Sequence, residues 1–322
     1  MKKLISIIWL FFIPVSFVFT GCRKNADIGK QGTNVLCTIY PVWIFTANVV
    51  GDIEGVNLEL LLPADASPHG KGLRPKDMEK IARADIIIFN GYDVEFEMQI
   101  EDAIRRENPK AVKIIASEGV KPLFYQNEPE YDEHGDEHGE HHHEHEGHEH
   151  KPGSRDPHTW VSPKQAIILV SNIRDGLIKA DEKNAEKYRE NAEVFIKKLE
   201  TLVKEFDEAS KDFNKRDIVT GHMAFAYLAR DFNLNITGVI EIIPQQEPSA
   251  SELIKMAEKI KAKPAAAIFV EPLVRKSIAE TLSEATGIPV RILDPCGVGK
   301  MDRDEYINKM RKNIEELKDA LM

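Results

Sequence analysis

Residues 34–62 read NVLCTIYPVWIFTANVVGDIEGVNLELLL. This stretch begins with one run of β-branched and apolar residues, Val35–Ile39, and ends with another, Val56–Leu62, and the segment between them is long enough for a helix. A strand, a helix and a second strand in this order form a βαβ unit, whose strands are parallel. We therefore expect folding to begin near Asn34 with a parallel sheet covered by helices.

The same alternation of short apolar runs and amphipathic stretches continues along the chain. Two more strand candidates complete a first series, and four others form a second series much later: Ile86–Asn90, Val112–Ala116, Ile218–Thr220, Leu234–Val239, Ala265–Val270 and Val290–Leu293. A length of 322 residues also favours about two domains. The pattern predicts an α/β fold with two lobes, each a mainly parallel sheet flanked by helices.

A long helical pattern separates the two series. Six apolar residues recur there at spacings of 4, 3, 4, 3 and 4: Tyr188, Ala192, Phe195, Leu199, Leu202 and Phe206. Such spacing places them along one side of a helix. A continuous helix over residues 184–212 would be about 40 Å long and would join the lobes rigidly, although two helices that meet near Glu200 would show the same periodicity. The predicted N-terminal lobe then covers 34–183, and the C-terminal lobe covers 213–322.

The net charge of −10 is unevenly distributed. Residues 127–150 hold ten acidic side chains and no Lys or Arg, so this segment alone carries a charge as large as that of the whole chain. Binding to nucleic acid requires clustered basic residues, which argues against nucleic acid as a partner. Hydrophobic residues make up 42% of the chain, which is enough for folded cores.

The N-terminus has the pattern of an export signal, because Lys2 and Lys3 precede the uncharged, mostly apolar run Leu4–Thr20. The Gly21-Cys22 pair that follows resembles the end of a bacterial lipobox. We expect a signal peptide over 1–21, a lipid on Cys22 and a flexible tether over 22–33. The mature protein would then be a membrane-anchored lipoprotein outside the cytoplasm. An ordinary signal peptide or a membrane anchor with an incidental cysteine is the alternative.

The histidines fall into two groups. Eight of the eleven lie within the acidic segment, where they alternate with Glu, Asp and Gly: His134, His138, His141, His142, His143, His145, His148 and His150. Imidazoles suit Zn²⁺, Cu²⁺ and Ni²⁺, and neighbouring carboxylates attract cations, so this loop is predicted to be an accessory metal-binding insertion. The alternative is a solvated loop without a metal role, or one that responds to pH.

The other three histidines, His69, His158 and His222, lie where a strand or turn gives way to a loop. A single histidine in such a place is more often a structural hydrogen-bonding residue than a ligand. Three together are different, because ligands of open α/β sheets gather at the carboxyl ends of the strands, and Asp294 also follows a strand candidate there. Three imidazoles and one carboxylate form a plausible four-coordinate Zn²⁺ site with two ligands from each lobe.

Four segments carry a family resemblance: Asp156–Pro163 (DPHTWVSP), Gly221–Leu228 (GHMAFAYL), Glu247–Ala250 (EPSA) and Leu293–Pro295 (LDP). From about Asn34 to Met322 the chain resembles the solute-binding lipoproteins of zinc and manganese ABC importers, in particular the zinc-uptake branch. The resemblance implies His69, His158, His222 and Asp294 as metal ligands, and two α/β lobes joined by a long helix. Manganese or iron members usually have glutamate at the third ligand position, so His222 favours zinc as cargo over Mn²⁺ or Fe²⁺.

Some residues near these segments depart from the family pattern or add to it. Glu271 follows a strand candidate and could accept the second N–H of a ligating imidazole, although a solvent-facing or helix-capping role fits equally well. Cys296 follows Asp294-Pro295 where the family commonly has an aliphatic residue, and is expected to be a buried thiol rather than a ligand. The sequence leaves open whether it pairs with Cys37. After His69 the family commonly has an aromatic residue, which is absent here.

The leading hypothesis is therefore a non-enzymatic, monomeric protein that captures Zn²⁺ and delivers it to the permease and ATPase subunits of an ABC importer. The sequence has no G-x-x-x-x-G-K-[ST] pattern, so other chains would have to supply the energy. A manganese or iron homologue is one alternative. Another is an exported zinc hydrolase, although H-E-x-x-H is absent, and a third is a metal-buffering surface protein.

Overall fold

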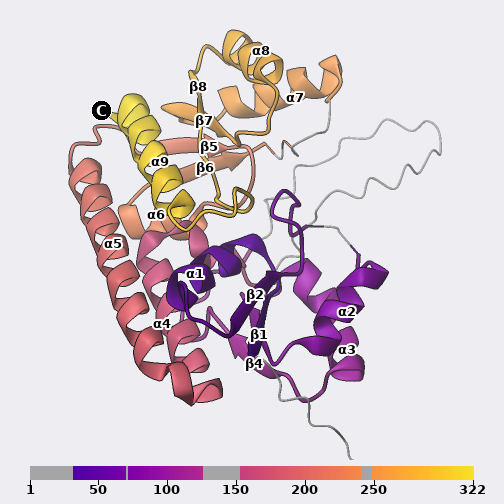
Figure 1. Ribbon diagram of the computed structural model, residues 1–322. Coiled ribbons are helices and arrows are strands. Elements are labelled where there is room, and N and C mark those ends of the chain that lie inside the picture. The colour runs from indigo at the N-terminus through magenta and orange to yellow at the C-terminus, as the bar shows by residue number, and fades with distance from the viewer. Residues whose placement is uncertain (1–31, 70–71, 126–152, 241, 243–247) are drawn as a thin grey trace, which may run out of the picture. The chain divides into compact units, whose positions relative to one another are not determined.

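The computed structural model describes residues 32–69, 72–125, 153–240, 242 and 248–322. The predicted signal peptide, Cys22 and the His-rich segment lie outside these residues. In the described part of the chain, two four-stranded parallel sheets are flanked by helices (Figure 1). The predicted fold class is thereby confirmed. None of the described helices is both long enough and apolar enough to cross a membrane.

The first sheet is built from β1 (Thr33–Cys37), β2 (Val56–Leu60), β3 (Ile86–Phe89) and β4 (Val112–Ile115). Its strand order is β2-β1-β3-β4, with Val35 opposite both Leu58 and Ile86. The connecting helices are α1 (Tyr40–Val50), α2 (Pro75–Arg83) and α3 (Glu95–Glu107). Every side chain of β3 is buried, as expected for a central strand covered on both faces.

The second sheet repeats this topology. It contains β5 (Asp217–Thr220), β6 (Asn235–Val239), β7 (Ala267–Val270) and β8 (Val290–Ile292) in the order β6-β5-β7-β8. Its helices are α6 (Ala226–Phe232), α7 (Ala250–Lys261), α8 (Lys276–Thr286) and α9 (Glu305–Leu321). In both sheets, the second and third strands of the series lie on opposite sides of the first. The chain therefore reverses its direction of winding beside β1 and beside β5, which is where ligands collect in such sheets.

Helix α5 (Ala185–Lys211) connects the lobes as one uninterrupted helix, so the two-helix alternative is wrong. All six residues of the predicted apolar stripe are buried. The helix packs against α4 (Pro163–Ala180) and α1 on one side of the junction and against α9 on the other (Figure 1). The larger of two buried apolar clusters extends from the first lobe along α5 into the second.

Local signals fix several helix ends. Ser249 caps α7, because its hydroxyl accepts from the Glu252 N–H and the Glu252 carboxylate accepts from the Ser249 N–H. This capping box satisfies two N–H groups that have no partner within the helix. Pro41 and Pro163 lie in the first turns of α1 and α4, where a missing N–H costs nothing.

Candidate metal centre

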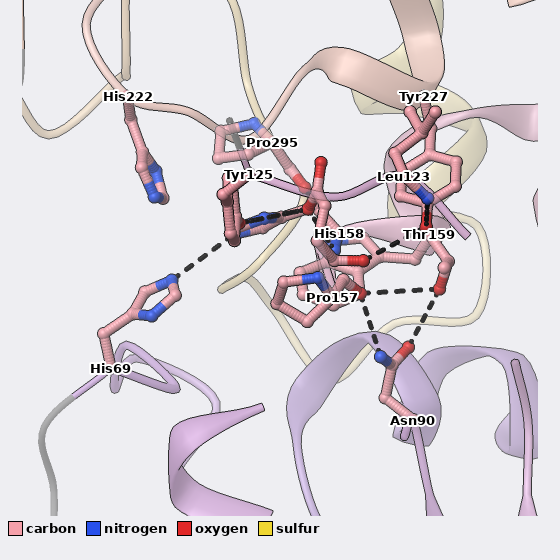
Figure 2. A network of polar contacts seen from close by, with 12 residues as sticks. His69, Asn90, Leu123, Tyr125, Pro157, His158, Thr159, His222, Tyr227 and Pro295 are labelled. Atoms are coloured by element: carbon pink, nitrogen blue, oxygen red, sulfur yellow. Dashed lines mark hydrogen bonds and ion pairs between the residues drawn. The ribbon is translucent and has the colours of Figure 1, made fainter. Parts of the chain in front are cut away.

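The structure brings His69, His158 and His222 together. One ring nitrogen from each lies within 4.8 Å of the others. The His69 and His158 Nε2 atoms are 3.3 Å apart, and the ring centroids of the three pairs are separated by 5.0–5.4 Å. Figure 2 shows His69 and His222 extending from opposite sides toward His158. Three imidazoles can therefore reach one ion.

Each histidine lies outside the regular helices and strands. His69 lies in the loop between β2 and α2, and His158 immediately precedes the short 3₁₀ helix η1 (Thr159–Val161). His222 is two residues beyond the end of β5. The side chains of His69 and His158 are 7% and 2% exposed, and that of His222 is 22% exposed. The cluster is thus shielded on the His158 side and open near His222.

A carboxylate stands behind each imidazole. The Nδ1 atoms of the three histidines lie 2.9, 2.8 and 2.7 Å from oxygens of Glu95, Asp156 and Glu271, respectively. A carboxylate can only accept here, so it favours the tautomer with the proton on Nδ1 and leaves the Nε2 lone pair for the shared space. Metal-binding histidines commonly have this outer partner, which orients the ring and strengthens the ligand.

Two of these carboxylates were not predicted from the sequence. Asp156 stands two residues before His158, and that short spacing is a local signal that could have found it. Glu95 is the first residue of α3, 26 residues from His69, and only the folding of the β2–α2 loop against the start of α3 brings the two side chains together. The structure places Glu271 beside His222, in the loop after β7, so of the two roles that the sequence left open it has that of an acceptor.

Burial keeps His158 neutral. Desolvation, followed by the nearby rings of His222 and His69, holds its pKa well below the ordinary value of 6.5. A neutral imidazole has a lone pair, whereas the protonated ring cannot bind a metal. His158 is therefore ready to act as a ligand at neutral pH.

The loop that carries His158 is held by hydrogen bonds from several elements (Figure 2). The Asn90 amide donates to the Pro157 carbonyl and accepts from the Thr159 hydroxyl, and the Tyr227 hydroxyl of α6 donates to the Asp156 carbonyl. These contacts fix the backbone on both sides of the ring. The position of the His158 ring is therefore set by contacts within the protein.

Asn90 is itself held by a buried acid. Glu97 of α3 accepts from the N–H groups of Asn90 and Gly91 and from the Thr38 hydroxyl. The turn needs glycine at 91, because φ is 87° and a Cβ there would approach Ile115 Cγ2 to 2.7 Å. Desolvation raises the pKa of Glu97 to about 7, against the opposing effect of these three donors.

The structure does not place Asp294 within the histidine group. Its Oδ2 lies 2.9 Å from Lys309 Nζ, and its Oδ1 accepts from the Cys296 N–H at 2.7 Å. Burial raises the pKa of the Cys296 thiol well above its ordinary value, and Cys37 and Cys296 are both free rather than joined as a disulfide. The predicted fourth ligand is thus engaged elsewhere in this structure.

The donor set suits a borderline-soft divalent cation. Three imidazoles would supply three of the four ligands of a tetrahedral Zn²⁺ site, and imidazole also binds Cu²⁺ and Ni²⁺. Mn²⁺ prefers oxygen donors, whereas this group of histidines offers ring nitrogens.

Comparisons with known proteins agree with this fold. The chain is 34% identical over 323 residues to the zinc-binding lipoprotein AdcA of Streptococcus pneumoniae (strain TIGR4), covering 99% of the chain and 61% of that protein. It is 32% identical to the high-affinity zinc uptake system protein ZnuA of Bacillus subtilis, covering 97% of each. The chain therefore spans about three fifths of the length of its streptococcal relatives.

Solved structures show the same architecture. The Zn(II)-bound ZnuA-like domain of Streptococcus pneumoniae AdcA matches with a TM-score of 0.71 and 30% identity, over 90% of this chain and 99% of that one. FpvC of Pseudomonas aeruginosa in complex with Mn²⁺ matches with a TM-score of 0.72 and 26% identity, over 90% and 98%. The sequence model described as "Zinc-uptake complex component A periplasmic" matches residues 35–320. The chain belongs to that family of zinc-uptake solute-binding proteins.

Proposed function

We propose that this protein is the extracytoplasmic zinc-binding component of an ABC importer, which captures Zn²⁺ between its two lobes and delivers it to a membrane permease. The observation that carries the proposal is the convergence of three histidines, each with a carboxylate behind it. Capture and release require no chemistry on the cargo. The importer's ATPase subunits would supply the energy.

Zinc is favoured by the donors rather than by the fold. A relative with this fold is known in complex with Mn²⁺, so the architecture alone does not select the cargo. Imidazole nitrogens from His69, His158 and His222 dominate the site here, and they favour Zn²⁺ over Mn²⁺ or Fe²⁺. A manganese or iron carrier is therefore the weaker alternative.

The N-terminal sequence supports a place at the membrane surface. We propose that residues 1–21 direct export, that Cys22 carries a lipid, and that residues 22–33 form a tether to the first lobe. The lobes would cover 34–183 and 213–322, on either side of the linking helix over 184–212. A relative named as a lipoprotein is consistent with this anchor. The mature chain would act as a monomer.

Native mass spectrometry tests the cargo. Residues 23–322, with and without 128–150, would be offered equimolar Zn²⁺ and Mn²⁺. We expect the shortened protein to be monomeric and to retain one zinc, which His222→Ala removes, and the longer protein to take up additional metal on the His-rich segment. As a control, Glu280→Gln changes an exposed residue of α8 and should keep the zinc. Retention of manganese in preference to zinc would contradict the proposal.

A hydrolase with three histidine ligands is tested separately. We expect no metal-dependent turnover of peptide or ester substrates by the zinc-loaded protein. Turnover that disappears in His158→Ala would show that the site performs chemistry rather than transport alone.

A further inference from the structure

The Asp294 carboxylate forms an ion pair with a lysine. Its Oδ2 lies 2.9 Å from Lys309 Nζ, and both side chains are only 15% exposed. Its Oδ1 accepts from the Cys296 N–H, which closes a short turn. Both carboxylate oxygens therefore have partners from the C-terminal segment. A shielded ion pair of this kind is screened by salt much less than a surface pair.

Helix α9 fixes this arrangement at several points. Lys309 also donates to the Val298 carbonyl at 2.6 Å, so its ammonium group is anchored in the loop between β8 and α9. Asn313, one turn further along the helix and 2% exposed, accepts from the Asp294 N–H and donates to the Asp294 carbonyl, both at 2.8 Å. Backbone and side chain of Asp294 are thus both held by α9.

The same segment reaches the histidine cluster. The carbonyl of Pro295, next to Asp294, accepts from the Trp160 indole N–H at 2.8 Å, and the Trp160 ring lies 5.2 Å from the His158 ring. The backbone beside Asp294 is therefore linked to His158 through Trp160, while the charge of the Asp294 carboxylate is balanced by the Lys309 ammonium group.

We propose that Lys309 sets the affinity of the site for its metal by competing with the ion for the Asp294 carboxylate. This inference rests on the zinc-binding function proposed above. While the ion pair persists, the three imidazoles would hold the metal without the Asp294 carboxylate, and the remaining ligand of the ion would exchange easily. Full coordination by Asp294 requires the Asp294–Lys309 contact to break. The pair weakens retention and favours release to the next carrier.

Four variants of the full mature chain test this proposal: Lys309→Met, Lys309→Arg, Asp294→Asn and the double variant Lys309→Met/Asp294→Asn. Zinc affinity would be measured by competition with a chelator, and the visible spectrum with Co²⁺ would report the coordination of the ion. We expect Lys309→Met to bind zinc roughly tenfold more tightly, the lower end of the effect of groups that surround metal ligands. The cobalt spectrum of Lys309→Met should change as an oxygen ligand is gained.

The remaining variants separate competition from a structural effect. Lys309→Arg preserves the positive charge and should resemble the unaltered chain. Asp294→Asn alone should change affinity little, but it should abolish the gain in the Lys309→Met background. An unchanged affinity in Lys309→Met, or a loss in Asp294→Asn as large as in His222→Ala, would overturn the inference. If His158→Ala and His222→Ala also leave the tight zinc site intact, the proposed function itself fails.

Discussion

The carboxylates at the Nδ1 atoms of the three histidines should influence how tightly the imidazoles bind a metal. Glu271 Oε1 lies 2.7 Å from His222 Nδ1, and its side chain is 13% exposed. A negative charge at this position raises the basicity of the ring and holds it in one orientation. His222 is the most exposed of the three histidines, so it has the least packing to orient it. Its outer carboxylate should therefore matter most.

We predict that Glu271→Gln lowers zinc affinity about tenfold and that Glu271→Ala lowers it up to about a hundredfold. Glutamine keeps an acceptor oxygen but removes the charge, whereas alanine removes both. Chelator competition measures the affinity, and Glu280→Gln on the exposed face of α8 is the matched control. Equal affinity in all of these variants would show that the ring is oriented by other contacts.

Glu97 makes stability depend on pH. Its pKa is raised from an ordinary 4.5 to about 7 by burial, so between these values the folded protein binds a proton that the unfolded chain has released. The stabilising contribution is present below pH 4.5 and is lost as the pH rises through 7. The lowered pKa of His158 acts in the opposite direction, because the folded state resists its protonation as pH falls.

At about 1.4 kcal/mol per pKa unit, Glu97 should lower the free energy of unfolding by about 3 kcal/mol as the pH rises from 4.5 to 7. We predict that Glu97→Gln removes this contribution. Glutamine does not titrate, and comparison with the unaltered chain cancels the contribution of His158. Urea unfolding of the metal-free protein at a series of pH values measures the slope. Glu107→Gln, at the exposed end of the same helix, should leave the slope unchanged. The same slope in both variants would contradict the assignment to Glu97.

At the scale of the elements, periodicity alone predicted most of the fold. All eight strand candidates correspond to observed strands, because runs such as Ile86–Phe89 combine β-branched residues with burial on both faces. The observed strand boundaries differ from the predicted ones by up to two residues. For example, the first strand was predicted at Val35–Ile39 and is observed at Thr33–Cys37. The linking helix was likewise predicted from its apolar stripe.

Contacts between side chains that are distant in the sequence could not be predicted from periodicity. The Glu95–His69 pair depends on where two sheet-edge loops meet, and the Lys309–Asp294 pair depends on how α9 packs beneath a turn. Nothing in the local sequence distinguishes Lys309 from other helical lysines. The strand-end rule nevertheless predicted that the three histidines would lie together, because that rule concerns topology rather than side-chain contacts.

The buried apolar residues of α5 should account for most of the contribution that this helix makes to the stability of the folded protein. Leu199 is 0% exposed in the core shared by both lobes, whereas Val194 on the same helix is 60% exposed. We predict that Leu199→Ala lowers the free energy of unfolding by about 2–5 kcal/mol, since it removes buried methyl groups and leaves a cavity. Val194→Ala, the matched control, should have little effect. Chemical denaturation of the metal-free variants measures both, and similar losses would mean that the stripe is not tightly packed.

At the scale of the whole described structure, the lobes are joined by more than α5. Trp160 donates to the Pro295 carbonyl of the second lobe, and its own carbonyl accepts from the Tyr306 hydroxyl of α9. On the other side of the junction, Ser162 and Gln165 donate to Asp231. Because these contacts and the larger apolar cluster cross the junction, separation of the lobes would expose buried surface and break several hydrogen bonds.

We therefore predict that the two lobes unfold in a single cooperative transition and that zinc shifts this transition as a whole. Tryptophan fluorescence, dominated by Trp43 and Trp160, and far-ultraviolet circular dichroism should give coincident curves for the metal-free protein. Free zinc at a hundred times its dissociation constant should add about 2.7 kcal/mol, because the ion binds only when the histidine loops of both lobes are in place. His222→Ala should unfold in one step and lose the zinc effect. Two separate transitions, or a zinc effect confined to one of them, would show that each lobe folds independently and that the metal does not couple them.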